Sequence, residues 1–490
     1  MQAEYRLALD HRVVGSIPPW FLSLTIDTSV LIGGRWWGES RGTKEGLSLD
    51  RVDPLDLGNP ELARWAAPLA PAVVRLGGTE ADRIRYGFRH DGMQTEPPRE
   101  AFVLTGKLWE RFNRWASDQG FQVLFTVSAG PESRDSDGRW SPKGAERLIR
   151  NTVRKGYPVV GWEFGNEVNA YPFLYGWRRS VTNRRYLEDF AVFADLVRRL
   201  APGTKTVGPA SAVWPLIGEP NPLLPALGRS PVSAFLDVMS FHFYPQQSSR
   251  GRVAVRRARE TTLLNARSLD GALRWVRHGR KSLARGPAAK APLWLTEAGH
   301  ALYGGEPGLS DTWLSTPWWL DQLGLLAHAG VEAVFRQSLV GGDYGLLGED
   351  FSPRPDYFAS VLWKARMGPL VHPKPEVSGP DRRLRAWHHG RPDGTSCLLL
   401  VNLHRRRWAS VTVPGDVRGV LVLEPEESLR SQTAVLNGVP LRGAAGLAAV
   451  QGCGAGPFVP GPVHLPPLGC AFVELSRAAP QEPLRLSRDS

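Results

Sequence analysis

Eight short apolar runs alternate with amphipathic helical stretches between residues 20 and 340. Each run has the length and mainly apolar composition of a strand that is covered on both faces of a parallel sheet. A strand followed by a helix, repeated eight times, predicts a closed (β/α)8 barrel. The strand-like runs are Phe21–Asp27, Val73–Gly78, Gln122–Ser128, Gly161–Glu167, Thr206–Ala210, Asp237–Tyr244, Leu293–Ala298 and Ala333–Ser338.

Beyond residue 368 the pattern changes to short alternating apolar segments, separated by Gly, Pro and Asn. This pattern is typical of an antiparallel β-sandwich. The segment Glu4–Val14 is also strand-like and precedes the barrel, so we expect it to join the sandwich. We therefore predict a barrel over residues 15–368 and a sandwich formed by residues 1–14 and 369–477. The polar, Pro-rich residues 478–490 are expected to form a disordered tail.

Two glutamates end the fourth and seventh strand-like runs. Glu167 closes the segment Gly161-Trp-Glu-Phe-Gly-Asn-Glu167, and Glu297 closes Leu293-Trp-Leu-Thr-Glu297. Active sites of such barrels are built at the C-terminal ends of the strands, and strands four and seven lie across the barrel mouth from each other. Two carboxylates roughly 5–5.5 Å apart are the requirement for retaining glycoside hydrolysis. We therefore interpret Glu167 as the acid/base and Glu297 as the nucleophile.

Polar residues beside these glutamates strengthen this interpretation. Asn166 is placed to bind a sugar 2-hydroxyl, a contact that strengthens in the transition state. The segment His242-Phe-Tyr244 ends the sixth strand-like run, where a tyrosine hydroxyl can bind the nucleophile and lower its pKa. Any one of these residues occurs often by chance at a strand end. Their occurrence together at strands four, six and seven favours an active site.

Two glycine-containing segments follow the seventh and eighth strand-like runs. Tyr303-Gly-Gly305 and Gly341-Gly-Asp-Tyr344 offer consecutive backbone N–H groups that no Cβ shields, which suits the binding of an anion such as a sugar carboxylate. The alternative is that both are tight turns that need a positive φ. The sequence leaves both readings open.

The formal net charge of +12 and the pI near 9.9 indicate a polyanionic partner or an Arg-rich proteome. Zinc-finger spacing, an aromatic RNA-binding signature and a basic coiled coil are absent from the sequence, which favours an acidic polysaccharide over nucleic acid. The three cysteines are too few for a disulfide framework or a zinc site, and we expect neither metal nor cofactor.

The sequence has no apolar run of transmembrane length, and its first residues lack the pattern of a signal peptide. Either the chain is cytoplasmic as made, or an export signal has been removed. The sequence decides neither the compartment nor the oligomeric state.

The chain resembles heparanase and the related endo-β-glucuronidases, a retaining family of barrel glycosidases. The resemblance covers nearly the whole chain and implies that Glu167 is the proton donor and Glu297 the nucleophile. It rests on motifs that include Phe21-Leu-Ser-Leu-Thr-Ile-Asp27, Arg75-Leu-Gly-Gly-Thr79, Gly165-Asn-Glu167, Leu309-Ser-Asp-Thr312, Arg336-Gln337, Pro353-Arg-Pro-Asp-Tyr357, Val401-Asn-Leu-His404 and Val435-Leu-Asn-Gly438.

The same resemblance implies a set of substrate-binding residues. Thr79 would line the pocket for the glucuronic acid, and Gly342 would lie toward the next sugar on the non-reducing side. We also expect His242, at the end of the sixth strand-like run, and Tyr303 to contact the substrate. The residues that match those holding the glucuronic acid are Asp27, Asn166, Gly304, Gly305 and Tyr344.

The chain also departs from the family. Glu80 stands where the human member carries a lysine, and the segment that the human member excises has no counterpart after Thr79. The chain is therefore expected to work uncut. Basic residues that grip sulfate do not align clearly, and Arg250, Arg252 and Arg256 are the candidates to replace them.

We therefore expect a retaining β-glucuronidase that cuts within heparan sulfate-type glycosaminoglycans, an anionic polysaccharide substrate. One alternative is an exo-β-glucuronidase that trims other glycans, which a loop walling off the groove past Asp27 would favour. Another is a non-catalytic polysaccharide-binding protein on the same scaffold. The presence of both Glu167 and Glu297, with Asn166 and Tyr244 beside them, argues against the non-catalytic reading.

Overall fold

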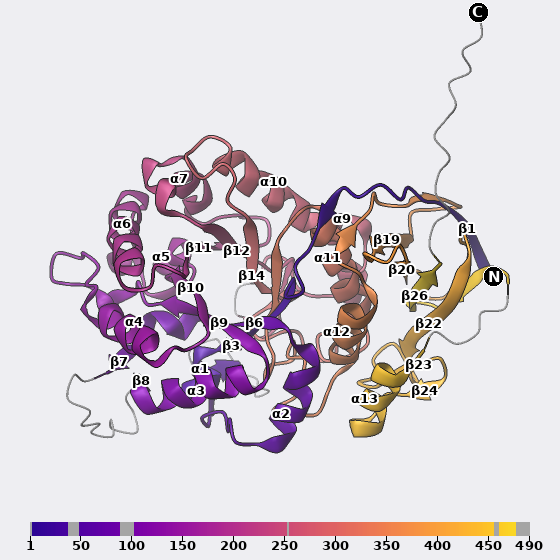
Figure 1. Ribbon diagram of the computed structural model, residues 1–490, viewed down its shortest axis with the longest axis horizontal. Coiled ribbons are helices and arrows are strands. Elements are labelled where there is room, and N and C mark those ends of the chain that lie inside the picture. The colour runs from indigo at the N-terminus through magenta and orange to yellow at the C-terminus, as the bar shows by residue number, and fades with distance from the viewer. Residues whose placement is uncertain (1, 38–48, 89–101, 252–253, 455–459, 477–490) are drawn as a thin grey trace, which may run out of the picture.

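The computed structural model describes residues 2–37, 49–88, 102–251, 254–454 and 460–476 (Figure 1). A closed barrel lies at one end of the molecule and a pair of β-sheets at the other, and the N-terminal strand lies among the sheets. The predicted tail over residues 478–490 falls outside the described residues. Within those residues, no helix is both long enough and apolar enough to cross a membrane.

Eight parallel strands close the barrel in sequence order, and the last pairs with the first through Val334 and Leu22. Their side chains are almost all buried, because helices cover the outside and layers of side chains fill the inside. The barrel strands are β3 (Leu22–Asp27), β6 (Ala72–Gly77), β9 (Phe121–Val127), β10 (Val159–Phe164), β11 (Lys205–Val213), β12 (Val238–Phe243), β14 (Leu293–Ala298) and β16 (Ala333–Arg336).

The helices outside the barrel begin and end at residues that suit helix termini. Thr105 and Thr182 each accept a hydrogen bond from a backbone N–H in the first turn that follows them, and Gly156 ends a helix in the left-handed conformation. The main helices around the barrel are α2 (Pro60–Ala66), α3 (Gly106–Asp118), α4 (Lys143–Lys155), α6 (Asn183–Leu200), α7 (Leu223–Arg229), α10 (Gly271–Leu283), α11 (Ser315–His328) and α12 (Pro355–Arg366).

Helix α11 is buried on nearly every side, because it lies between the barrel and the sandwich. Arg385, on strand β19 (Leu384–Gly390), donates to Asp321 of this helix at 2.8 Å. The indole N–H of Trp387 donates to the same carboxylate at 2.9 Å. This buried pair joins the sandwich to the barrel, so the two cannot shift relative to each other without breaking it.

Two sheets form the sandwich. One has the order β18-β1-β21-β25, and the other β2-β17-β19-β20-β26-β22-β23-β24. The prediction of a barrel with a sandwich that includes an N-terminal strand is confirmed. Besides β19, the strands are β1 (Gln2–Ala8), β2 (Gly15–Ser16), β17 (Leu370–Val371), β18 (Glu376–Ser378), β20 (Ser396–Asn402), β21 (Trp408–Thr412), β22 (Val417–Pro425), β23 (Ala434–Leu436), β24 (Val439–Pro440), β25 (Val463–Leu465) and β26 (Cys470–Leu475).

One strand pair departs from the antiparallel pattern. Strand β1 runs parallel to β21, with Gln2 opposite Trp408. It reaches this sheet from the other end of the chain and not through a hairpin, so no short turn imposes the antiparallel direction. Strand β2 pairs with β17 in the larger sheet. The division into domains at residues 14 and 368 stays a prediction.

Candidate active site

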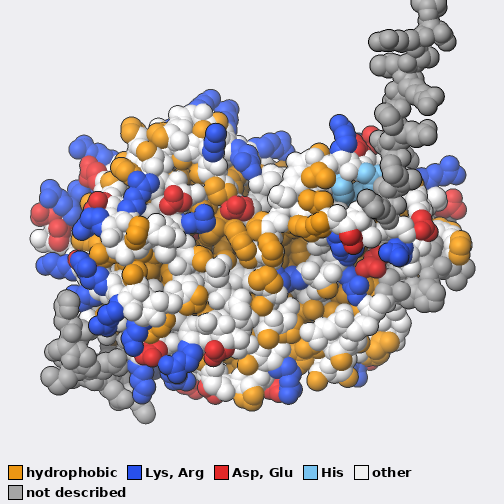
Figure 2. Space-filling model, viewed as in Figure 1, with side chains coloured by type: hydrophobic (Ala, Val, Ile, Leu, Met, Phe, Trp, Pro, Cys, Tyr) orange, Lys and Arg blue, Asp and Glu red, His pale blue; other side chains and the backbone are white. Residues whose placement is uncertain are grey.

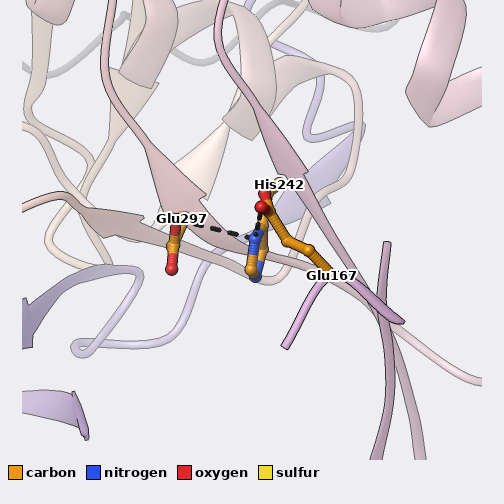
Figure 3. Close-up of side chains that lie close together, drawn as sticks. All are labelled: Glu167, His242 and Glu297. Atoms are coloured by element: carbon orange, nitrogen blue, oxygen red, sulfur yellow. Dashed lines mark hydrogen bonds and ion pairs between the residues drawn. The ribbon is translucent and has the colours of Figure 1, made fainter. Parts of the chain in front are cut away.

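Glu167 and Glu297 approach each other at the mouth of the barrel. A carboxylate oxygen of each and a ring nitrogen of His242 all lie within 4.8 Å of one another. Figure 3 shows the imidazole between the two carboxylates, with Nδ1 at 3.1 Å from Glu167 and 3.5 Å from Glu297. The two side chains are only 6% and 5% exposed. Such a pair is close enough to act on the two sides of one glycosidic bond.

The sequence predicted that Glu167 ends its strand, but Glu167 lies beyond the strand. Strand β10 ends at Phe164, and Glu167 follows three residues later in the left-handed conformation, with φ of 53°. Its backbone N–H donates to Ala210 of β11 at 3.1 Å. The strained backbone turns this carboxylate toward the barrel mouth, and strain of this kind is common at functional sites.

Both oxygens of the Glu297 carboxylate accept a hydrogen bond. Arg75 donates to Oε1 and the hydroxyl of Tyr244 donates to Oε2, each at 2.8 Å. Burial raises the pKa of Tyr244 well above its usual value, and the Glu297 charge raises it further, so the hydroxyl stays a donor. Two fixed donors hold this carboxylate in one orientation.

Arg75 is fully buried and also binds two other residues of the site. Its Nε donates to Glu163 at 2.6 Å and its Nη2 donates to the side-chain oxygen of Asn166 at 2.8 Å. Burial opposes the charge of Glu163, but Arg75 outweighs burial and holds the pKa of Glu163 below its usual value. Neither Arg75 nor Glu163 was predicted from the sequence as a site residue. The available signal was a charged side chain within an apolar strand, which must be paired when buried.

Asn166 is held from two sides. Its backbone N–H donates to Asp82 at 2.8 Å, and its side-chain oxygen accepts from Arg75 and from the backbone of Gly78. Burial raises the pKa of Asp82 to about 6. Within the described part of the chain no residue binds the Asn166 Nδ2 group, which leaves this donor for a sugar hydroxyl.

Asp27 lies at the end of β3, where its carboxylate accepts from the backbone N–H of Ser29 at 2.9 Å. It is buried, and burial raises its pKa well above the usual value. A Cβ added at Gly78 would lie 1.8 Å from an Asp27 oxygen, so only glycine permits this approach. Thr79 follows directly, and its carbonyl oxygen accepts from the Tyr175 hydroxyl at 3.1 Å.

The glycine-containing segment after β14 is a tight turn. Tyr303, Gly304 and Gly305 have φ angles of 69°, 81° and 92°. The carbonyl oxygen of Gly304 accepts the backbone N–H groups of Asp343 and Tyr344 at 2.7 and 3.3 Å, which ties this turn to the loop after β16.

Gly342, in the loop after β16, also has a positive φ, of 65°. Tyr344 is buried, and burial raises its pKa well above the usual value. Its ring lies 6.4 Å from that of Tyr244, so this loop reaches the carboxylate pair. The Tyr303 hydroxyl accepts a hydrogen bond from Gln247 at 3.5 Å.

The side chain of Arg250 points into the protein and not toward solvent, where sulfate would bind. It is 5% exposed, donates to the carbonyl of Gly305 at 3.1 Å and forms an ion pair with Asp343. Arg256 is partly buried and donates to Ser268, and Arg252 lies outside the described residues. On the face shown in Figure 2, Lys and Arg side chains are spread over most of the surface and are not gathered into one patch.

Glu167, His242 and Glu297 are also the one group of His, Cys, Asp and Glu, among the residues with described positions, that is compact enough to hold a metal ion. A cation there would lie beside Arg75, whose guanidinium already binds Glu297 at 2.8 Å. Because like charges repel, the Arg75 guanidinium disfavours a metal ion between these three residues.

The sequence model of the glycosyl hydrolase family 79 N-terminal domain matches residues 30–324. The chain belongs to glycosyl hydrolase family 79. Heparanase from Mus musculus is 28% identical over 458 residues, which cover 80% of this chain and 77% of the relative. Baicalin-beta-D-glucuronidase from Scutellaria baicalensis is 26% identical over 427 residues, covering 78% and 76%.

Solved structures show the same fold at lower identity. A 4-O-alpha-L-rhamnosyl-beta-D-glucuronidase from Fusarium oxysporum 12S has a TM-score of 0.65 and 15% identity, covering 96% of this chain and 100% of its own. The family 79 assignment confirms the predicted resemblance to heparanase and its relatives and makes the chain a glycoside hydrolase.

Proposed function

We propose that this family 79 chain is a retaining β-glucuronidase, with Glu297 as nucleophile and Glu167 as acid/base. The observation that carries the proposal is the approach of the two carboxylates to within 4.8 Å. Glu297 attacks the anomeric carbon while Glu167 protonates the leaving oxygen, which gives a covalent glycosyl-enzyme. Glu167 then takes a proton from water, and the water oxygen displaces Glu297 with net retention.

The neighbours of Glu297 support its role as nucleophile. Arg75 and Tyr244 bind both of its oxygens, so the carboxylate is held in one orientation before the substrate arrives. His242 lies at 3.1 Å from Glu167 and orients the acid/base group toward the leaving oxygen.

The glucuronic acid would be bound between the loops after β3, β14 and β16. Asp27 has a raised pKa, so it can donate a hydrogen bond from a protonated carboxyl group to the sugar. The phenol of Tyr344 stays protonated and can donate to the sugar carboxylate. Residues whose backbone or side chains would complete this subsite are Thr79, Asn166, Tyr303, Gly304, Gly305 and Gly342.

We further propose an anionic polysaccharide of the heparan sulfate type as substrate, cut within the chain. The net charge of +12 favours such a polymer, and relatives named heparanase match most of this chain. The second candidate is removal of terminal glucuronic acid from smaller glucuronides, which the similarity to baicalin-beta-D-glucuronidase favours.

The two carboxylate roles are tested by two variants. Glu167→Gln should lower turnover of heparan sulfate by about 10²–10⁴-fold, and turnover of an aryl glucuronide with a good leaving group far less. Glu297→Gln should abolish turnover of both substrates and labelling by a mechanism-based glucuronide probe. Equal losses of both activities in Glu167→Gln, or labelling of a residue other than Glu297, would contradict the assignment.

Product size distinguishes the two modes of cutting. Internal cutting of heparan sulfate gives oligosaccharides of intermediate length early in the reaction, and terminal trimming gives free glucuronic acid from the start. NMR of the first product formed shows its anomeric configuration. An inverted configuration would exclude a covalent glycosyl-enzyme, whether the enzyme cuts internally or at the end of the chain.

A further inference from the structure

Several large apolar side chains are exposed on the loops that follow β10 and β11. Leu216 is 78% exposed and Trp177 75%, the highest values for a large hydrophobic residue in the described part of the chain. Phe173 and Ile217 are 58% and 56% exposed. Exposed apolar patches of this kind mark binding sites, because their exposure costs free energy that only a ligand recovers.

The aromatic rings of this patch are packed on one another. Phe173 lies 5.0 Å from the ring of Trp214 and 6.1 Å from that of Trp177, between ring centroids. We call Phe173, Trp177 and Trp214 the aromatic platform. Leu216 and Ile217 lie beside it at the tip of a turn, in which Trp214 and Gly218 exchange two backbone hydrogen bonds of 2.9 Å.

Both loops are anchored to the barrel. Asn169, two residues after Glu167, exchanges two side-chain hydrogen bonds of 2.9 Å with the backbone of Ala212 on β11. Tyr175 donates to Thr79, and the guanidinium of Arg83 lies 5.0 Å from the Tyr175 ring. The platform is therefore part of a fixed surface, so its rings do not have to be ordered when a ligand binds.

The platform lies on the side of the site where the leaving group must be. The acid/base residue protonates the leaving oxygen, so the leaving part of the substrate runs past Glu167. Phe173 follows Glu167 by six residues on the same loop. Asp27 ends β3 and Tyr344 follows β16, and both are proposed to hold the glucuronic acid. Other strands separate β3 and β16 from β10 in both directions around the barrel.

Two cations stand next to the platform. Arg178 and Arg179 follow Trp177 directly and are exposed, and neither forms an ion pair with any residue whose position is described. A flat aromatic face favours the C–H face of a sugar ring, and a free guanidinium favours a carboxylate or sulfate. An acidic polysaccharide offers both groups in alternation, whereas an uncharged small aglycone would leave the cations without partners.

We propose that Phe173, Trp177 and Trp214, together with Arg178 and Arg179, bind the leaving-group side of an acidic polysaccharide chain. Sugar rings beyond the cleaved bond stack on the aromatic faces, and the arginines pair with the acidic groups. This inference rests on the proposed β-glucuronidase function and adds to it an extended binding surface for a polymer.

The test compares long and short substrates. Trp177→Ala and Phe173→Ala should each lower kcat/KM on a heparan sulfate oligosaccharide by about tenfold. On 4-nitrophenyl β-D-glucuronide, which has no sugar beyond the cleaved bond, kcat/KM should stay within about twofold. Trp408→Ala is the matched control, because Trp408 is 49% exposed on the sandwich. It should change neither value. An unchanged kcat/KM on the oligosaccharide, or equal losses on both substrates, would overturn the proposal.

A binding measurement separates this proposal from the function on which it rests. In the Glu167→Gln background, Trp177→Ala should raise the Kd of the oligosaccharide about tenfold, and Arg178→Gln with Arg179→Gln should weaken its dependence on salt. If the wild-type protein hydrolyses neither substrate but this loss of affinity appears, the β-glucuronidase proposal fails and the platform stands. If Trp177→Ala weakens the binding of an aryl glucuronide with a large flat aglycone but not the binding of the oligosaccharide, the platform binds an aromatic aglycone and the polysaccharide proposal is wrong.

Discussion

Arg75 donates to Glu297 through Nη1 at a distance of 2.8 Å, and both side chains are buried. The same guanidinium binds Glu163 at 2.6 Å, so one cation lies between two carboxylates. Burial favours the uncharged form of Arg75, but these two carboxylates outweigh it and raise its pKa. The proposed nucleophile therefore depends on Arg75, which does not touch the cleaved bond but orients the carboxylate that does.

Replacing Arg75 should damage both stability and activity. Arg75→Gln leaves Glu163 buried without its cation, and breaking a buried pair in this way costs about 3–5 kcal/mol. The variant should also lower kcat by at least about 10²-fold, because Glu297 loses one of its two donors. Denaturant unfolding and turnover of an aryl glucuronide measure the two effects. The control is Arg150→Gln, which breaks an exposed pair with Glu146 and should cost less than about 1 kcal/mol. Equal stability of the two variants would contradict the argument.

The hydroxyl of Tyr244 should matter for catalysis more than for folding. Tyr244→Phe keeps the ring and removes the donor 2.8 Å from Glu297, so kcat should fall by about 10–10²-fold. Tyr357→Phe is the matched control, because the Tyr357 hydroxyl is buried and has no hydrogen-bond partner among the residues that the structure describes. Steady-state kinetics on an aryl glucuronide should show normal turnover for this control. Normal turnover in Tyr244→Phe would mean that the contact with Glu297 has no role in the reaction.

Gly78 should be intolerant of a side chain because of Asp27. Gly78→Ala would place a Cβ 1.8 Å from the Asp27 carboxylate and displace it from the proposed sugar subsite, so KM should rise and kcat/KM should fall by at least about tenfold. Gly415→Ala has nearly the same positive φ, +95° against +96°, with open space around its Cβ. It measures the backbone strain alone and should leave the kinetics unchanged. Similar kinetics in the two variants would show that the close approach to Asp27 is not needed.

His388 of the sandwich, which packs against two other histidines, should make the stability of the protein depend on pH in the acidic range. His388 lies 4.3 Å from His372 and 5.2 Å from His11 between ring centroids. Neither of its buried ring nitrogens has a hydrogen-bond partner in the described part of the chain. Burial, and then the neighbouring histidines, lower the pKa of His388 to about 3; burial also lowers that of His11, which Asp10 partly opposes.

Because the folded pKa lies below the unfolded value of about 6.5, the stabilisation is complete above that pH and declines as the pH falls toward 3. The slope is at most about 1.4 kcal/mol per pH unit for this proton. His388→Phe should flatten the dependence of the unfolding free energy on pH, measured between pH 7 and pH 4. His464→Phe, at an exposed position in β25, should keep the slope of the parent protein. A slope that His388→Phe leaves unchanged would place the acid sensitivity elsewhere.

Much of this molecule could be predicted from local patterns along the chain. Apolar runs between helical stretches identify barrel strands because a strand covered on both faces must be largely apolar. The same count placed Glu167 and Glu297 near the mouth, because every parallel strand of a barrel ends on the same side. It missed the turn that carries Glu167 beyond its strand, since a left-handed residue other than glycine is held by contacts that are distant in sequence.

The sequence by itself determined which strands form the barrel and which side of it carries the carboxylates. Only the tertiary structure decided the partners of the buried charges, because these depend on the register of neighbouring strands. Thr126 lies opposite Glu163 in the pairing of β9 with β10, and both then converge with Arg75 of β6. A charged residue within an apolar strand must be paired when it is buried, but the sequence does not show which residue pairs with it. The closed barrel, in which residues far apart in sequence share one interior, supplies the partner.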